Sequence, residues 1–121
     1  MQVIILDASG SVDSDQLRLG KEFAQTLAGT IGRRELACQV IASGFDRGQH
    51  QHEQIPKLVK AFRSFDALCK VHLITDGFIS DDEVSAVDYI YLHQGVLLKD
   101  FSEEFQSKII GIVPSDSQQK D

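Results

Sequence analysis

A short segment near the N-terminus carries three side chains whose types suit a hard divalent cation. Asp7 ends an apolar run, and Ser9 and Ser11 follow it at alternate positions in the sequence Asp-Ala-Ser-Gly-Ser. Magnesium and calcium are bound in proteins by oxygen ligands, and magnesium requires a nearly octahedral set of them. One carboxylate and two hydroxyls on one turn therefore predict a metal-dependent binding site.

A second carboxylate occupies a similar place later in the chain. Asp76 follows an apolar run over residues 71–75 and precedes Gly77. Ligands of open α/β sheets bind beyond the carboxyl ends of the strands, at the point where the strand order reverses. The step of 69 residues between the two aspartates (76 minus 7) leaves room for a helix, a strand and a second helix. The later strand can therefore return beside the first one on its other side, and we expect Asp7 and Asp76 to face one another.

The elements that must position these side chains follow from the hydrophobic pattern. Strand-like and helix-like periods alternate along the chain, which is typical of α/β folds with parallel strands and crossover helices. The pattern predicts strands over residues 2–7, 36–45, 71–75, 89–92 and 109–113. It predicts helices over residues 14–30, around 55–62, from 80 toward 87, and over 101–107. Residues 96–98 fit either a further short strand or a hairpin arm.

Capping signals sharpen the helix boundaries. Asp13 with Gln16, and Ser80 with Glu83, have the spacing of capping boxes that open a helix. Gly32 stands where a glycine commonly closes a helix. Pro56 is expected in the first turn of the second helix, where the missing N–H costs nothing. In that helix Phe62 is expected in the core, and Phe65 is expected there as well.

Composition narrows the function classes. The chain has 121 residues, 42% of them hydrophobic and 25% charged, which is typical of one folded domain, here residues 1–114 with a polar tail over 115–121. The net charge of -6 argues against a nucleic-acid partner. The longest apolar run is far shorter than the ~20 residues of a membrane span, and the N-terminus lacks a signal-peptide pattern, so we expect a cytoplasmic protein without a membrane partner. Cys38 and Cys69 fit buried thiols better than a disulfide.

The two aspartate loops together resemble those of the von Willebrand factor A (vWA) domain. The sequence Asp-Ala-Ser-Gly-Ser-Val after the first strand, and Ile-Thr-Asp-Gly at the end of a later one, carry the resemblance. It implies a three-layer, Rossmann-like α/β fold with a mostly parallel central sheet flanked by helices. It also implies a metal-ion-dependent adhesion site in which Asp7, Ser9, Ser11 and Asp76 bind Mg²⁺, or Mn²⁺ or Ca²⁺. A protein partner would complete the metal shell with an acidic side chain.

The chain departs from the family pattern at one ligand. A vWA domain takes a threonine ligand from a central loop, but the threonines of this chain are Thr26, Thr30 and Thr75, none of which lies there. Asp46 is the nearest oxygen donor in the corresponding loop. Asp46, Ser43 or a water molecule could substitute for the threonine, or the site could bind metal weakly.

Histidines offer a competing metal site. His50, His52 and Glu53 alternate in a polar segment, and on an extended chain alternate side chains point the same way, as a zinc site would need. Histidines in a polar loop are more often simply solvated, so zinc is the weaker interpretation. His72, within a strand, and His93, beside a turn, are expected to be structural.

Three functional hypotheses follow, from different classes. The first and preferred one is a metal-dependent protein-binding module without enzymatic activity. The second is a magnesium-dependent phosphohydrolase that resembles haloacid dehalogenases, with Asp7 as nucleophile and Asp76 with Asp81 or Asp82 holding the metal. Against it, Ser9 stands where such an enzyme carries its acid-base aspartate. The third is a scaffold that keeps the vWA fold but has lost the metal.

Overall fold

Five parallel strands form the centre of the protein. The computed structural model describes residues 2–7, 13–32, 36–42, 51–77, 79–96 and 101–114, without the side chains of 36–42 and 51–54. The strands are β1 (Gln2–Asp7), β2 (Leu36–Ala42), β3 (Lys70–Thr75), β4 (Tyr89–His93) and β5 (Ile109–Val113). The helices are α1 (Ser14–Ile31), α2 (Gln51–Phe65), α3 (Asp81–Ala86) and α4 (Glu103–Lys108). The fold is therefore α/β, as the alternating pattern predicts.

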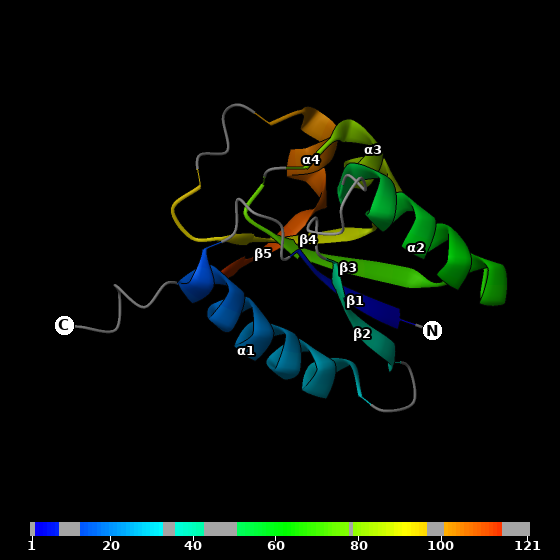
Figure 1. The fold of residues 1–121 in the computed structure, drawn as a ribbon, viewed down its shortest axis with the longest axis horizontal. Coiled ribbons are helices and arrows are strands. Elements are labelled where there is room, and N and C mark those ends of the chain that lie inside the picture. Colours follow the sequence, from blue (N-terminus) through cyan, green and yellow to red (C-terminus); the bar gives the residue numbers. More distant parts are fainter. Residues whose placement is uncertain are drawn as a thin grey trace.

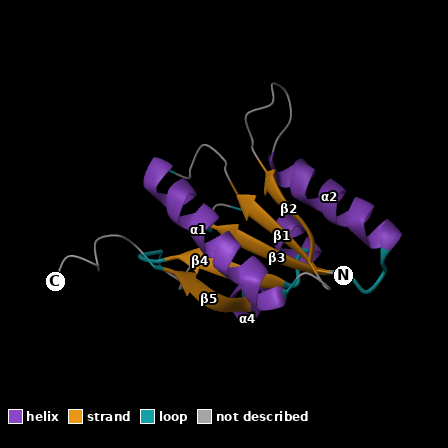
Figure 2. Cartoon of the chain, turned by 90° about the horizontal axis from the view of Figure 1, so that it is seen from below, coloured by secondary structure: helices purple, strands orange, loops and turns teal. Residues whose placement is uncertain are grey.

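The strand order is β2-β1-β3-β4-β5, and every neighbouring pair is parallel. Figure 2 shows the arrows of the sheet side by side and pointing the same way. Because β1 lies between β2 and β3, the chain adds strands first on one side of β1 and then on the other. The predicted reversal of strand order at β1 is confirmed, and all carboxyl ends meet at one edge of the sheet.

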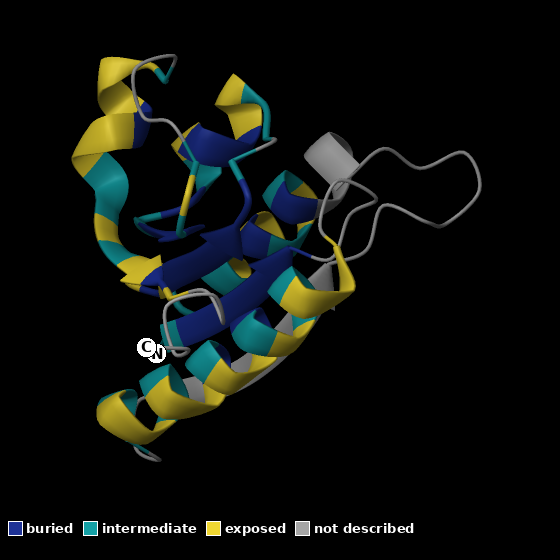
Figure 3. Cartoon of the chain, turned by 90° about the vertical axis from the view of Figure 1, so that its left-hand side faces the viewer, coloured by how far each residue is buried: buried dark blue, intermediate teal, exposed yellow. Residues whose placement is uncertain are grey.

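Helices cover both faces of this sheet. Figure 1 shows α1 on one side, with α2, α3 and α4 on the other. Along β1, Val3 and Ile5 pack toward the side of α2, while Ile4 and Leu6 pack toward α1. Both faces are thus buried, which explains why the central strands read as continuous apolar runs. In Figure 3 the central strands are correspondingly buried, and the helices expose their outer faces. The edge strand β5 is less covered, with Ile110 and Ile112 exposed.

The capping signals are confirmed in detail. The Asp13 carboxylate accepts a hydrogen bond from the N–H of Gln16 at 2.8 Å, and the Gln16 side chain accepts one from the N–H of Asp13 at 3.1 Å. Ser80 and Glu83 form the same reciprocal pair at the start of α3. Gly32 ends α1 with a φ of 86°, a conformation that favours glycine. Both loops that follow β1 and β3 therefore lead into capped helix starts at the carboxyl edge.

Several boundaries and one core assignment differ from the sequence predictions. Strand β2 covers Leu36–Ala42, and residues 43–45 of the expected strand lie outside the described residues. Helix α2 begins at Gln51, so Pro56 lies in its second turn and the expected first-turn position is wrong. Phe62 packs against the core, but Phe65 is 89% exposed because α2 ends there and the chain turns back toward β3. Val96 lies outside any strand, and the rest of the expected 96–98 segment falls outside the described residues.

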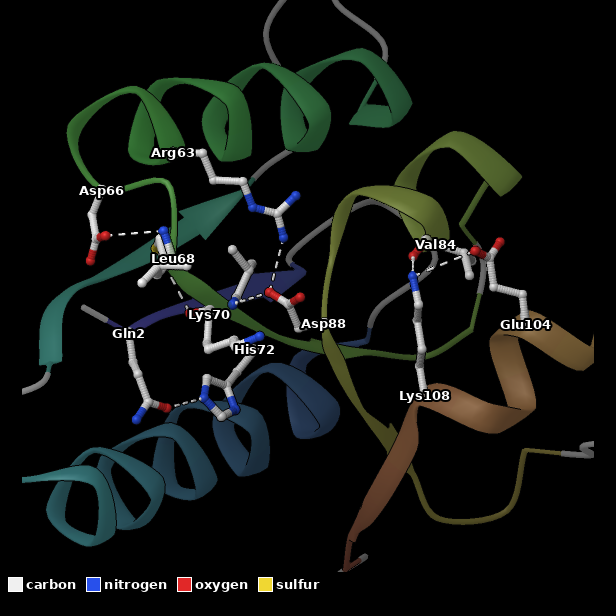
Figure 4. A network of polar contacts seen from close by, with 12 residues as sticks. Gln2, Arg63, Asp66, Leu68, Lys70, His72, Val84, Asp88, Glu104 and Lys108 are labelled. Carbon is white, nitrogen blue, oxygen red and sulfur yellow. Dashed lines mark hydrogen bonds and ion pairs between the residues drawn. The ribbon is translucent and has the colours of Figure 1, made fainter.

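A polar network joins the carboxyl end of α2 to the amino ends of β3 and β4 (Figure 4). One carboxylate oxygen of Asp88 accepts hydrogen bonds from Arg63 at 3.0 Å and from the N–H of Val71 at 2.8 Å. The N–H of Asp88 donates in return to the carbonyl of Val71. This single carboxylate joins α2 to the start of β3 and sets β4 beside it, so it fixes the register of the strands that end at the candidate site.

Among the described residues, no helix combines the length and the apolar character that crossing a membrane would need.

His72 is a buried histidine whose two ring nitrogens both have partners. Nε2 lies 2.6 Å from the amide oxygen of Gln2, to which it donates, and Nδ1 lies 2.9 Å from the Tyr91 hydroxyl. Burial lowers the pKa of His72 from its usual value of 6.5, and the nearby Asp88 carboxylate opposes this shift. The neutral ring therefore fits this position, and a second ring proton is unfavourable in the folded state.

Acid should consequently destabilise the fold through this histidine. Because the pKa of His72 is lower in the folded state than its unfolded value of 6.5, the unfolded chain takes up the proton first as the pH falls. The stability contributed by the neutral ring is complete above pH ~6.5 and is lost as the pH falls toward the folded pKa. Urea unfolding between pH 8 and 5 should show this decline, and His72→Gln should show a shallower one. Equal slopes for the two proteins would contradict the assignment.

Candidate functional site

Two carboxylates stand at the carboxyl ends of the two central strands. Asp7 is the last residue of β1, and Asp76 directly follows β3, which is paired with β1. Both are buried, with exposed fractions of 0% for Asp7 and 9% for Asp76. Carboxylates are rarely buried unless other groups satisfy them. Their position at the strand reversal makes this edge the candidate site.

Thr75 holds the carboxylate of Asp7 in place. Its hydroxyl donates a hydrogen bond of 2.7 Å to Oδ2 of Asp7, and both side chains are fully buried. The same hydroxyl accepts a hydrogen bond of 3.1 Å from the N–H of Gly77. Across the strand pair, Asp7 is bonded to the residue before Asp76, and the expectation that Asp7 and Asp76 face one another stays a prediction. Thr75 thus links the end of β1 to the turn that carries Asp76.

His93 lies at the same edge, at the end of β4. It is 3% exposed, and its Nε2 has no hydrogen-bond partner among the described residues. Burial lowers the pKa of His93, while the charges of Asp76, Asp7 and Asp13 oppose this in that order. The three carboxylates therefore lie within electrostatic reach of the imidazole. The sequence expected only a structural role for this residue.

Gly20 allows α1 to approach His93 closely. A Cβ at Gly20 would lie 2.7 Å from Cδ1 of Leu6 and 3.6 Å from Cε1 of His93. The missing side chain lets the helix pack tightly on the sheet just behind the site. His93 is therefore enclosed between the sheet and α1.

The remaining predicted ligands cannot be placed. Ser9, Ser11 and Asp46 lie outside the described residues, as does Ser43. Asp81 and Asp82 are exposed in the first turn of α3, where acidic side chains favour the positive end of the helix dipole. The predicted ligand roles of Ser9, Ser11 and Asp46 stay predictions.

The described side chains alone do not complete a metal site. Within the described residues, no group of three or more His, Cys, Asp or Glu side chains is arranged to hold a metal ion. A cation beside Asp7 and Asp76 would need further oxygens, and residues 8–12 and 43–50, which follow β1 and β2 in the sequence, lie outside the described residues. The donor chemistry of the two carboxylates fits Mg²⁺, which takes oxygen ligands and commonly keeps several waters.

The zinc alternative assumed an extended segment, but the described part of that segment is helical. His52 and Glu53 lie in the first turn of helix α2, and His50 is outside the described residues. On a helix, residues one and two apart point in different directions. The alternation of an extended segment, which would have aligned these side chains, is therefore absent from residues 51–53.

A comparison of the chain with protein-family models, curated proteins and solved structures found no match. The chemistry of the carboxyl edge is therefore the basis for a functional proposal.

Thr75 and His93 are the residues that sequence reasoning missed at this edge. Each stands at the end of a buried strand, as Asp7 does. A polar residue that ends an apolar run is the signal that could have found both, because all parallel strands end at the same edge. Thr75 was overlooked because the next residue, Asp76, is the more obvious metal ligand.

Removing the Thr75 hydroxyl should destabilise the fold. In Thr75→Val the Asp7 carboxylate and the N–H of Gly77 both lose a bonding partner, and a buried group left unsatisfied costs about 1–3 kcal/mol. Thr75→Ser keeps the hydroxyl and should lose less. Urea denaturation of the two variants measures the difference. A valine variant as stable as the serine variant would show that the hydroxyl contributes nothing.

Gly77 should be intolerant of any side chain. Its φ is 94°, and a Cβ there would lie 2.8 Å from Cζ of Phe101. Gly77→Ala should therefore reduce the free energy of unfolding by about 1–3 kcal/mol, from backbone strain and overpacking. Gly29→Ala is the matched control, since a Cβ at Gly29 meets nothing within 4 Å. The control should stabilise by roughly 0.5–1 kcal/mol, because alanine is the better helix former. A drop of equal size in both variants would refute the explanation.

Proposed function

We propose that this chain is a metal-dependent protein-binding module of the vWA type, with a three-layer vWA fold. The observation that carries the proposal is the placement of Asp7 and Asp76 on paired parallel strands at the point where the strand order reverses. That point is where open α/β sheets bind ligands. The short Asp-Ala-Ser-Gly-Ser segment begins at Asp7, the last residue of β1.

The two aspartates are suited to different tasks. Asp7 has no exposed surface and is bound to Thr75, so it would act on the cation through an ordered water. Asp76 keeps a small exposed fraction, 9%, and would be the carboxylate nearer to the ion. Ser9 and Ser11 would add hydroxyl ligands, and Asp46 would take the place of the family's threonine. Mg²⁺ is the preferred cation, with Mn²⁺ or Ca²⁺ as substitutes.

The charge of the site supports a partner that binds through the metal. The chain carries a net charge of -6, and Asp81 and Asp82 are exposed in the first turn of the helix that follows the Asp76 turn. An acidic side chain of a partner protein would be repelled by this edge. A divalent cation reverses the local sign and offers a coordination position to that side chain. Binding of the partner would therefore depend strictly on the cation.

The phosphohydrolase alternative has less support. A nucleophilic aspartate must bring one carboxylate oxygen to phosphorus, but Asp7 is fully buried and one of its oxygens accepts the Thr75 hydroxyl. Ser9 also occupies the position of the expected acid-base aspartate. Incubation with p-nitrophenyl phosphate and Mg²⁺ checks this alternative directly. We expect no turnover, and turnover that disappears in Asp7→Asn would favour the enzyme.

Cation binding should stabilise the folded chain. At a concentration a hundredfold above the dissociation constant, a ligand that binds only the folded state raises the free energy of unfolding by about 2.7 kcal/mol. Thermal and urea unfolding with Mg²⁺, Mn²⁺ or Ca²⁺ should show this gain in the parent. Asp7→Asn and Asp76→Asn should abolish it, because each replaces a carboxylate with a neutral amide of the same shape.

Asp82→Asn is the matched control for these variants. Asp82 is exposed in the first turn of α3, and its replacement removes one acidic charge without touching the two buried carboxylates. The control should keep the full cation response. No response of the parent to any of the three cations would refute the metal-dependent module and leave the metal-free scaffold. An equal loss in Asp82→Asn would show that the response comes from general charge screening.

A further inference from the structure

The histidine at the end of β4 stands beside the proposed site. The last residue pair of β3 and β4 is Thr75 with Leu92, so Asp76 and His93 are the next residues of two neighbouring strands. His93 is 3% exposed, and α1 closes over it at Gly20. The side chain is therefore fixed at the carboxyl edge, where it cannot turn to solvent.

Its ring nitrogen lacks the partner that such burial requires. Nε2 of His93 has no hydrogen-bond partner within the described part of the chain. Buried polar side-chain atoms are bonded in the large majority of cases, and each exception calls for an explanation such as a bound ion or water. His72 is a direct comparison, because both of its ring nitrogens have partners. The unpartnered nitrogen is thus a property of the site and not of buried histidines in this sheet.

Acidic side chains lie near this ring. Asp76, Asp7 and Asp13 all act electrostatically on the His93 ring. No three acidic, histidine or cysteine side chains in the described ranges are close enough together to share an ion. The His93 ring is close enough to the carboxylates to interact with them electrostatically, but it does not form a set of direct metal ligands with them. This arrangement suits a contact with the cation through a water molecule. Magnesium commonly keeps several of its waters in protein sites, which supplies the intermediary.

We propose that Nε2 of His93 binds a water molecule in the shell of the cation held at Asp7 and Asp76. His93 would then be a positioning residue, and the ligand of the site would be a hydrated divalent cation, Mg²⁺ or Mn²⁺. This inference rests on the proposed function. It adds a nitrogen that accepts a hydrogen bond from the coordinated water and so favours cations that retain their waters.

The test compares His93 with the other buried histidine. Isothermal titration calorimetry with Mg²⁺ and with Mn²⁺ is carried out on the parent, His93→Leu, His93→Gln and His72→Leu. Loss of a group that supports a metal site through an intermediary typically weakens affinity 10–100-fold. We expect a loss of that size in His93→Leu and a partial return in His93→Gln, whose amide can reach the position of Nε2.

His72→Leu provides the control for a merely structural role. It removes two hydrogen bonds at the other end of the sheet, so its melting temperature should fall while its cation affinity stays that of the parent. His93→Leu should lose cation affinity, and its melting temperature measured without cation should fall less than that of His72→Leu. Unchanged affinity in a folded His93→Leu would overturn the inference. So would an equal loss of affinity in both leucine variants.

A measurement on the parent keeps the inference testable if His93→Leu does not fold. Titration of ¹⁵N-labelled protein with Mg²⁺ should shift the ring nitrogen signals of His93 and leave those of His72 in place. If the parent binds Mg²⁺ through Asp7 and neither ring responds, the role of His93 is refuted while the proposed function stands. If the parent binds neither Mg²⁺ nor Mn²⁺, the proposed function fails first, and the role of His93 fails with it.

Discussion

The hydrogen bond from Thr75 to Asp7 is the interaction on which the geometry of the candidate site depends. It joins the ends of the two central strands at the point where the strand order reverses. A charged carboxylate with no exposed surface would be costly without a donor at this distance. Because the same hydroxyl also accepts from the N–H of Gly77, it fixes the turn that carries Asp76. One side chain therefore positions both carboxylates relative to the sheet.

The rest of the fold serves to bring these strand ends together. Asp88 ties the starts of β3 and β4 at the opposite edge, so the register that aligns Thr75 with Leu92 is set far from the site. Above the carboxyl edge, capped helix starts follow β1 and β3, with Asp13 and Ser80 accepting from the first-turn N–H groups. In each of these crossovers the side chain of the N-cap residue accepts a hydrogen bond from an N–H group of the first helical turn. The other polar groups at this edge can therefore bond to the loops or to a ligand.

Much of this arrangement could be predicted from the sequence because it depends on local patterns. Short apolar runs and helical apolar repeats predicted the five strands and four helices, and the reversal at β1 followed from the length of chain between Asp7 and Asp76. What failed depends on neighbours in space. The periodicity of α2 placed Phe65 in the core, but α2 ends at Phe65, and this side chain is exposed. The bond between Thr75 and Asp7 could not be read from spacing, since it arises from the register of two paired strands.

The two buried histidines show how stability and function can be separated within one sheet. Both have a pKa lowered by burial, so both cost the folded state something at acidic pH. His72 offsets that cost with two hydrogen bonds, to Gln2 and Tyr91. His93 has no such bond at Nε2 among the described residues, and it stands where β4 ends beside the carboxylates. A fold selected only for stability would favour an apolar side chain at such a position, because an apolar group of similar shape leaves no buried atom unsatisfied. A histidine at this position therefore costs the fold stability, and a ligand that bonds to Nε2 would offset that cost.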